Sequence, residues 1–167
     1  MKYSLTKNTK EWCGITLFQI KAEISFGNVN KGDLGGYIEK ESNLSQDGDA
    51  WVSGNAWVYG DALVSGNARV SGNAWVSGNA RVSGDALVSG NARVYGDAWV
   101  YGDAWVYGDA WVSGDALVYG DARVSAKLFQ IKAEISFESV VKGELGGYIE
   151  KEENLSQDGN AWVSGNA

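Results

Sequence analysis

Small and apolar residues recur every six positions through the middle of the chain, from Asp49 to Ala126. Thirteen consecutive hexads read Asn or Asp, then Ala, then Trp, Leu or Arg, then Val, Ser or Tyr, and Gly, with Ala126 replacing the last Gly. Ala and Val alternate with the variable residues, which is the pattern of a strand with one buried face. A repeat of six residues cannot bury a core alone, so the hexads must coil and stack. The sequence therefore predicts an all-β fold, a β-solenoid.

The Gly and the Asn or Asp that follows it separate these short strands. Both residue types adopt positive φ at little cost, so they favour sharp corners. Strands joined by corners form a polygon whose interior is lined by Ala and Val. The Trp, Leu, Arg, Ser and Tyr positions are predicted to point outward.

The aliphatic and small positions, Val52 with Ala56 and Val58 with Ala62, continue in phase down the array. This pattern resembles the hexapeptide-repeat proteins of the left-handed parallel β-helix type, although Gly here stands two places after Val rather than one. The resemblance implies a triangular parallel β-solenoid, left-handed, with three hexads, or 18 residues, in each coil. At about 4.8 Å per coil, the array would rise roughly 20 Å.

Residues eighteen apart should then stack in outward columns. The three columns at the variable strand position are Trp51, Arg69, Leu87, Trp105 and Arg123; Trp57, Trp75, Arg93 and Trp111; and Leu63, Arg81, Trp99 and Leu117. Each Arg has a Trp as a column neighbour, and such stacking contributes about 0.5–1 kcal/mol at an exposed site. Stabilisation of the surface is the favoured interpretation. The alternative is an aromatic strip for sugars or another rod, formed by Trp57, Trp75 and Trp111 with Tyr59 and Tyr95.

A different module occurs twice, at 17–56 and 128–167, with six substitutions in forty residues. Each copy begins with an alternating segment, Phe18–Phe26 or Phe129–Phe137, and continues through a Gly-rich turn into the hexad phase. Gln46 and Asp47 are predicted to form a two-residue bulge before the regular array. We therefore divide the chain into an N-terminal β cap (1–48), the solenoid (49–126) and a second cap with a solenoid stub (127–167).

The two caps differ in what precedes them. Before the first copy, Cys13-Gly14 is placed where a two-residue hairpin turn would join a strand to it. The second copy follows the last hexad directly, so its strand is predicted to have an open edge, and open edges recruit strands. The residues concerned are Phe129, Ile131, Ile135 and Phe137. Head-to-tail assembly is one outcome; closure of the solenoid by the second cap, or a fragment of a longer array, are the others.

The cap sequence, Lys31 to Glu39 with Asn43-Leu44-Ser45-Gln46, resembles that of uncharacterised bacterial and prophage hexapeptide-repeat proteins described as polymer-forming. That resemblance implies a structural or surface role. The best-known left-handed β-helix proteins are acyltransferases and carbonic anhydrases, which use His as base or zinc ligand. This chain contains no His, so neither chemistry is expected, and we predict no enzyme and no cofactor. Cys13 is interpreted as a turn residue rather than a nucleophile.

The corner columns include three stacked carboxylates, Asp85, Asp103 and Asp121. Neighbouring carboxylates repel, by about 1 kcal/mol per pair in water, so this column is a weak candidate for a cation, while simple corner chemistry is the favoured interpretation. The net charge of −7 and the absence of a basic stripe argue against nucleic acid as a partner. We expect no membrane segment and no signal peptide, and hence a cytoplasmic or virion-associated protein.

Together these features predict a non-enzymatic structural β-solenoid that associates with itself, end to end, through its duplicated caps. The alternative is a binding module, for carbohydrate or a protein partner, that uses the exposed Trp and Tyr columns.

Overall fold

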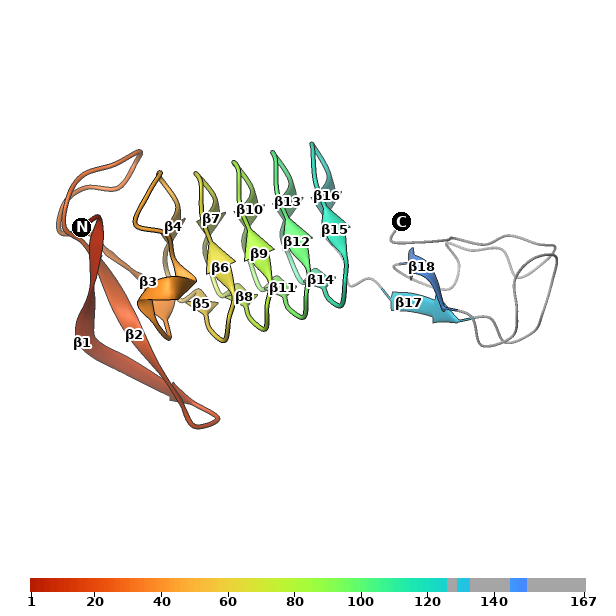
Figure 1. Ribbon diagram of the computed structural model, residues 1–167, viewed down its shortest axis with the longest axis horizontal. Helices are drawn as coiled ribbons and strands as arrows, with labels where there is room; N and C mark the ends of the chain where they lie inside the picture. The colour runs from red at the N-terminus through yellow and green to blue at the C-terminus, as the bar shows by residue number, and fades with distance from the viewer. Residues whose placement is uncertain (126–128, 133–144, 150–167) are drawn as a thin grey trace. The chain divides into compact units, whose positions relative to one another are not determined.

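The computed structural model describes residues 1–125, 129–132 and 145–149 of the 167-residue chain. The chain forms two compact units, Met1–Ser125 and Ala126–Ala167. Within the described residues, the regular elements are β-strands apart from one short 3-10 helix. The all-β prediction is therefore confirmed (Figure 1).

The first unit begins with a long β-hairpin. Strand β1 (Tyr3–Trp12) pairs antiparallel with β2 (Ile15–Ala22), and Trp12 lies opposite Ile15. The two residues between the strands both have positive φ, +47° at Cys13 and +80° at Gly14. This backbone is typical of the two-residue turns that match the twist of a hairpin, as the Cys-Gly sequence predicts.

Strand β3 (Leu34–Ile38) connects this hairpin to the solenoid. It pairs antiparallel with β2 on one side and parallel with a solenoid strand on the other, with Tyr37 opposite Trp57. The 3-10 helix η1 (Glu41–Asn43) follows it. A Cβ at Gly35 would lie 2.6 Å from the carbonyl oxygen of Val52, so the glycine allows β3 to approach the first coil closely.

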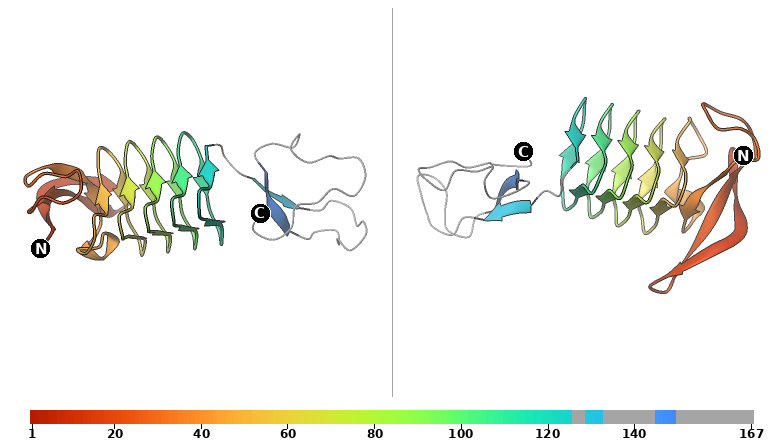
Figure 2. Two further views of the ribbon diagram at one scale, coloured as in Figure 1. Left: turned by 90° about the horizontal axis from the view of Figure 1, so that it is seen from above. Right: turned by 180° about the vertical axis from the view of Figure 1, so that it is seen from behind.

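Thirteen two-residue strands then occupy the same place in successive hexads. They are β4 (Trp51–Val52), β5 (Trp57–Val58), β6 (Leu63–Val64), β7 (Arg69–Val70), β8 (Trp75–Val76), β9 (Arg81–Val82), β10 (Leu87–Val88), β11 (Arg93–Val94), β12 (Trp99–Val100), β13 (Trp105–Val106), β14 (Trp111–Val112), β15 (Leu117–Val118) and β16 (Arg123–Val124). Figures 1 and 2 show them as rows of arrows on stacked coils.

The solenoid strands belong to three parallel sheets, one on each side of the coil. Their orders are β5-β8-β11-β14, continuing from the hairpin and β3; β4-β7-β10-β13-β16; and β6-β9-β12-β15. Partners are eighteen residues apart, as in the pairs Trp57 with Trp75 and Leu63 with Arg81. The predicted 18-residue coil and its three outward columns are therefore confirmed.

The first coil is longer than the others. Ile38 lies opposite Val58, and Leu44 forms a bridge to Val64, so these partners are twenty residues apart. From the pair Trp51 and Arg69 onward the spacing is eighteen. The two additional residues lie between Leu44 and Trp51, which agrees with the bulge predicted at Gln46 and Asp47.

The core of the first unit is a narrow column of small side chains. Every Ala and Val at the inward hexad positions from Ala50 to Ala110 is at most 1 % exposed. At the N-terminal end Tyr3, Ile20 and Ile38 continue the same cluster. The interior prediction, Ala and Val inward, is thus confirmed along the described solenoid.

The corners depend on glycine. From Gly48 to Gly120, the φ angle of each sixth-residue Gly lies between +61° and +75°. A Cβ on Gly84 would also lie 2.8 Å from the amide nitrogen of Gly102 in the next coil. Both the backbone conformation and the close stacking of corners therefore exclude side chains at this position.

The strand predicted over Phe18–Phe26 is wrong in length, although Ile20 and Ala22 of its predicted inward face are buried. Strand β2 ends at Ala22, and Ile24 is 51 % exposed. The buried residues of the strand are Leu17, Ile20 and Ala22, because the pairing of β2 with β3 shifts between Gln19 and Lys21 and interrupts the alternation.

In the second unit the structure describes two antiparallel strands, β17 (Phe129–Lys132) and β18 (Leu145–Ile149). Phe129 lies opposite Ile149, Gln130 opposite Tyr148 and Lys132 opposite Leu145. These three pairs correspond to Phe18–Ile38, Gln19–Tyr37 and Lys21–Leu34 of β2 and β3. The second copy of the module therefore repeats the strand pairing of the first, including its register shift.

Candidate binding face and cap interface

The sheet β5-β8-β11-β14 carries a continuous ladder of aromatic and guanidinium groups. The indole rings of Trp57 and Trp75 stack at 4.9 Å between centroids and 4° between planes. The Arg93 guanidinium carbon lies 4.5 Å from the Trp75 ring and 5.2 Å from the Trp111 ring. Arg93 is thus held between two indoles, an arrangement favoured by cation–π attraction.

The N-terminal hairpin covers the first part of this ladder. The Trp12 ring meets Trp57 and Trp75 edge to face, at 5.6 Å and 5.2 Å between centroids. The Lys10 ammonium lies 4.1 Å from the Tyr37 ring and 5.7 Å from the Trp57 ring. The hairpin therefore covers part of the Trp57 and Trp75 side chains, both of which stay partly exposed.

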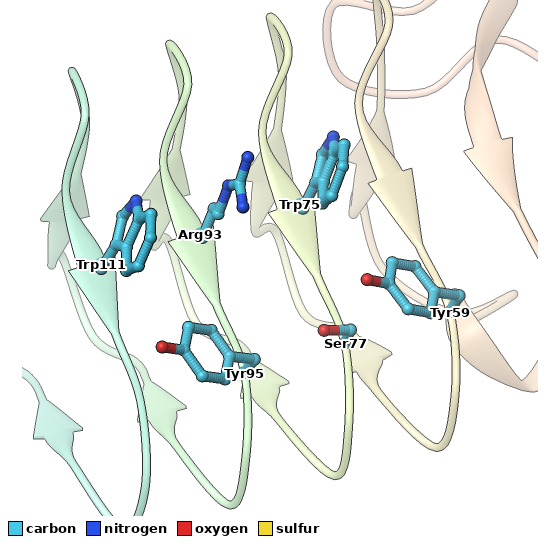
Figure 3. Close-up of a pocket in the computed structure, with 6 residues that line it drawn as sticks. All are labelled: Tyr59, Trp75, Ser77, Arg93, Tyr95 and Trp111. Atoms are coloured by element: carbon cyan, nitrogen blue, oxygen red, sulfur yellow. The ribbon is translucent and has the colours of Figure 1, made fainter. Parts of the chain in front are cut away.

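Beyond the hairpin this face is hollowed into an open groove of about 240 Å³. Its lining residues, drawn in Figure 3, are Tyr59, Trp75, Ser77, Arg93, Tyr95 and Trp111. Trp75, Arg93 and Trp111 form one row, and Tyr59, Ser77 and Tyr95 form a second row beside it (Figure 3). The short Ser77 side chain between two tyrosines leaves the hollow.

Four of the five aromatic residues singled out from the sequence line this groove: Tyr59, Trp75, Tyr95 and Trp111. Trp57, the fifth, lies in the ladder beneath Trp12. Sequence reasoning missed Ser77 and Arg93 as lining residues. The available signal was the alternation of Tyr and Ser at residues 59, 77, 95 and 113, which the other two columns at this hexad position lack.

The other columns contain separate contacts. Arg123 stacks on Trp105 at 4.5 Å, and Tyr101 stacks on Tyr119 at 5.4 Å between centroids and 12° between planes. Trp51 is only 6 % exposed despite its outward position, because Phe26 packs against it at 5.5 Å between centroids. Arg and Trp side chains that are neighbours in a column therefore stack at some positions. At the start of the array, the cap buries Trp51.

The corner columns form hydrogen-bonded ladders of side-chain amides. Asn73 Nδ2 donates to Asn91 Oδ1 at 3.2 Å, and Asn91 Nδ2 donates to Asp109 Oδ1 at 2.9 Å. In the other two columns Asn67 donates to Asp85 at 2.9 Å and Asn79 to Asp97 at 2.8 Å. Each carboxylate at the end of such a bond is stabilised as an acceptor.

The column of Asp85, Asp103 and Asp121 is the candidate cation site from the sequence. The Asp85 carboxylate accepts the hydrogen bond from Asn67, and the backbone N–H of Asp85 donates to the Gly102 carbonyl. Across the described part of the chain, no group of three or more His, Cys, Asp or Glu side chains is arranged to hold a metal ion. The cation site at this column stays a prediction from the sequence.

The N-terminal end of the first coil is closed by polar side chains. Lys2 Nζ donates to the carbonyl oxygens of Gly48 at 3.2 Å and Ala50 at 3.0 Å. Asn43, which is fully buried, donates from Nδ2 to the carbonyls of Gly60 at 3.0 Å and Ala62 at 2.8 Å. These side chains satisfy backbone groups that a preceding coil satisfies elsewhere.

Strand β1 is fixed to this end by two further residues. The Gln46 side chain accepts from the Lys2 amide at 2.7 Å and donates to the Tyr3 carbonyl at 3.2 Å. Tyr3 Oη donates to the carbonyls of Leu44 at 2.6 Å and Glu41 at 2.9 Å. The predicted bulge at Gln46 thus makes a strand-like contact with β1.

Burial changes the acid–base properties of this cap. Desolvation raises the pKa of the Tyr3 phenol to about 12, and the Glu41 carboxylate adds to the effect. Desolvation lowers the pKa of the Lys2 ammonium, against the attraction of Asp49 and Asp47. At the surface, the hydrogen bond between Lys40 and Asp61, 2.7 Å long, raises the pKa of Lys40 and lowers that of Asp61.

The remaining candidates lie at the hairpin tip and in the second module. Cys13 is an exposed free thiol in the turn. Phe129 and Ile131 belong to β17, whereas Ile135 and Phe137 lie outside the described residues. In the part of the chain that the structure describes, no helix has the length and apolarity to cross a membrane.

Comparison with known protein families gives matches to one family of repeats. The model described as YdcK β-solenoid repeat matches residues 62–78, 74–90 and 86–102. These overlapping matches cover the described strands from β6 to β12. A comparison with curated proteins gives no match.

Proposed function

We propose that this chain, a repeat β-solenoid protein, has a structural role and associates end to end through its duplicated cap modules. In this assembly, strand β1 of one molecule pairs with β17 of the next, in the register that it has with β2 in its own sheet. The proposal assigns the chain no catalytic activity and no cofactor, since a chain without His lacks the commonest general base.

The observation that carries the proposal is the shared register of the two modules. Strands β17 and β18 pair as β2 and β3 do, with the same shift after the second residue pair. In the first module, β2 is flanked by β1 and β3. Among the described residues, β17 has only β18 as a partner, in a two-stranded sheet. An edge of this kind accepts an added strand.

The residues that receive β1 are retained in the second module. Across the hairpin, Ser4 lies opposite Lys21, Leu5 opposite Ile20 and Tyr3 opposite Ala22. The segment Leu17–Ala22 is repeated without change as Leu128–Ala133. Strand β1 would therefore meet the same side chains in the same order on β17. The contacts that β1 gives up on β2 are therefore regained on the identical segment of the next molecule, which keeps the cost of the transfer low.

The outer edge of β1 favours exchange over simple addition of another strand. Its pairing with β2 is interrupted between Leu5 and Thr9, and Lys7 and Asn8 in this interruption are exposed. Bulges and exposed Lys are devices that keep an edge strand from recruiting others. The Cys13-Gly14 turn, with two residues at positive φ, is the hinge that would have to open.

Disulfide trapping tests the proposed register in the full chain. In a Cys13→Ser background, Ser4→Cys is combined with Lys132→Cys, the counterpart of Lys21. Opposed residues of antiparallel strands have Cα separations of about 4.5–5.5 Å, which suits a disulfide. We expect mild oxidation to give a ladder of covalent oligomers in a non-reducing gel, together with a mass in light scattering that rises with concentration.

Two variants serve as controls. Ser4→Cys with Lys21→Cys should give a cross-linked monomer, because this disulfide holds β1 on β2 and blocks its transfer to another molecule. Lys7→Cys with Lys132→Cys shifts the first residue by three positions, about 10 Å along a strand, and should cross-link poorly. A cross-linked monomer from Ser4→Cys with Lys132→Cys would show closure within one molecule. That result, or a monomeric mass at high concentration, contradicts the proposal.

A further inference from the structure

The groove on the β5-β8-β11-β14 face interrupts the column of Tyr59, Ser77 and Tyr95, and at Ser77 it has room for one six-membered ring. Where tyrosines occupy neighbouring coils, as at Tyr101 and Tyr119, their rings stack at 5.4 Å. Tyr59 and Tyr95 are two coils apart, about 9.6 Å at the spacing of a sheet, and Ser77 lies between them. The place that a third tyrosine ring would fill is therefore empty.

One wall of the groove presents a positioned hydrogen-bond donor. The Arg93 guanidinium is held between the Trp75 and Trp111 rings, and this stacking restricts the directions in which its N–H groups can point. Among the described residues, Lys40 and Asp61 form an ion pair, but Arg93 lies within ion-pair distance of no carboxylate. Its donors are available to a ligand, next to the Ser77 hydroxyl and the aromatic faces.

The corners beside the groove determine which charge it tolerates. The ladder of Asn73, Asn91 and Asp109 runs along the corner before this face. Asp61, Asn79 and Asp97 occupy the corner after it. Arg93 is the one cation here, and the corners beside it carry the carboxylates of Asp61, Asp97 and Asp109. The surroundings of the groove are therefore not positively charged, and the chain as a whole has a net charge of −7. This environment complements a neutral ligand with hydroxyl groups, which both donate and accept, better than an anion.

We propose that this groove binds a neutral pyranose residue of an oligosaccharide. The saturated C–H face of the sugar would pack on the Trp and Tyr rings, and its hydroxyls would bond to Arg93 and Ser77. A flat ring held between two others needs about 7–8 Å at contact distances of about 3.5–4.0 Å, so the wider space between Tyr59 and Tyr95 suits the thicker, puckered ring. Nucleic-acid bases also stack on aromatic rings, but their phosphates require a basic surface.

The groove can be closed without a change of fold. Tyr is the native residue at this hexad position in residues 59, 95, 101, 107 and 119, so Ser77→Tyr uses a residue that the solenoid accommodates. The new ring would stack between Tyr59 and Tyr95 and occupy the proposed sugar site. Ser71→Tyr makes the same change on the β4-β7-β10-β13-β16 face and is the matched control.

Affinity electrophoresis of the full-length protein tests the proposal, in gels that contain soluble neutral polysaccharides: a glucan, a mannan, a galactomannan and a xylan. We expect at least one of them to retard the protein. Ser77→Tyr should weaken the affinity at least tenfold, and Ser71→Tyr should change it less than twofold. Arg93→Leu should weaken binding at least fivefold, whereas Arg81→Leu, on another face, should not. Leu occurs at this position in the native array, and circular dichroism checks that each variant is folded.

Salt separates the proposed ligand from an acidic one. Binding of a neutral sugar should change little between about 50 and 500 mM salt, because screening affects charged partners. Absence of retardation by every neutral polysaccharide overturns the proposal. So does equal binding by Ser77→Tyr and the native protein, or binding confined to acidic polysaccharides that is lost as salt is raised.

Discussion

Individual side chains close the end of the solenoid by replacing the backbone of a coil. Asn43 donates two hydrogen bonds, to the carbonyls of Gly60 and Ala62, and Lys2 donates to the carbonyls of Gly48 and Ala50 at another corner of the coil. Both residues are buried, at 0 % and 4 % exposure. A buried carbonyl without a donor costs about 1–3 kcal/mol, so each of these side chains stabilises the first coil. Asn43 has a counterpart in Asn154 of the second module, while Lys2 precedes the duplicated segment.

Tyr3 gives this cap a measurable dependence on alkaline pH. Its pKa is raised from 10.0 to about 12, so the folded protein holds the phenolic proton more tightly than the unfolded chain. The stabilisation is complete below about pH 10 and is lost as the pH rises through 12. This difference between the folded and unfolded pKa of Tyr3 corresponds to about 2–3 kcal/mol in the free energy of unfolding. We expect the native protein to lose about this much more stability than Tyr3→Phe between pH 9 and pH 12, in urea unfolding followed by circular dichroism.

The comparison with Tyr3→Phe also isolates the phenol from other groups. At pH 7 the variant should be less stable by about 1–3 kcal/mol, because the buried Leu44 carbonyl loses the phenol as its donor, while the Glu41 carbonyl still accepts from the Leu44 amide. Lys2, whose pKa is lowered, favours folding as the pH rises toward 10.5, and it does so in both proteins. Parallel stability curves for the two proteins above pH 10 would contradict the role of Tyr3.

At the scale of one element, a strand of two residues has no stability alone, and the corner must supply the geometry. Each corner Gly combines a positive φ with contact to the Gly of the next coil. The penalty for a side chain should therefore depend on whether another coil follows. Gly84 faces Gly102, whereas an added Cβ on Gly120 meets no heavy atom of the described residues within 4 Å.

Replacement of these two glycines by alanine separates the two effects. Gly120→Ala should cost about 1–2 kcal/mol, the penalty for an L-residue in left-handed backbone. Gly84→Ala should cost about 1–3 kcal/mol more, because its Cβ would overlap the backbone of Gly102. Thermal and urea unfolding measure the difference. Equal losses would mean that the coils are free to move apart at the corners.

Much of this element-level structure follows from the sequence because the repeat is local. The Ala and Val interior, the eighteen-residue columns and the two-residue bulge at Gln46 come from periodicity, and they are confirmed. The shift in β2, the cover of Trp12 over Trp57 and the closure by Lys2 depend on contacts made by residues outside the hexad repeat. Periodicity contains no information on such contacts. The left-handed winding stays a prediction from the resemblance.

At the scale of the first unit as a whole, burial decreases from the cap toward residue 125. Ala and Val from Ala50 to Ala110 are almost completely buried, but Ala116, Ala122 and Val124 are only partly buried. In a stacked array each coil is stabilised by its neighbours. Coils near the cap therefore have more support than the last described coil.

Hydrogen exchange read by mass spectrometry should detect this gradient. We expect peptides from residues 50–100 to exchange at least tenfold more slowly than peptides from residues 111–125, because local opening needs less free energy where fewer contacts are broken. A dilute sample limits association between molecules. Uniform protection from β4 to β16 would contradict the gradient and show that the first unit opens as a single body.

The coil contains three hexads, whereas the sequence repeats with one, and this difference restricts how the array can change in length. Insertion of a single hexad between Tyr59 and Ser77 would leave every corner and every inward Ala and Val in phase. It would nevertheless move Tyr59 to a different face from Ser77 and Tyr95, and dismantle the groove. Only insertions or deletions in multiples of eighteen residues preserve both the stack and its surface pattern. Duplication of repeats therefore offers this chain many folded variants, of which about one in three keeps its columns aligned.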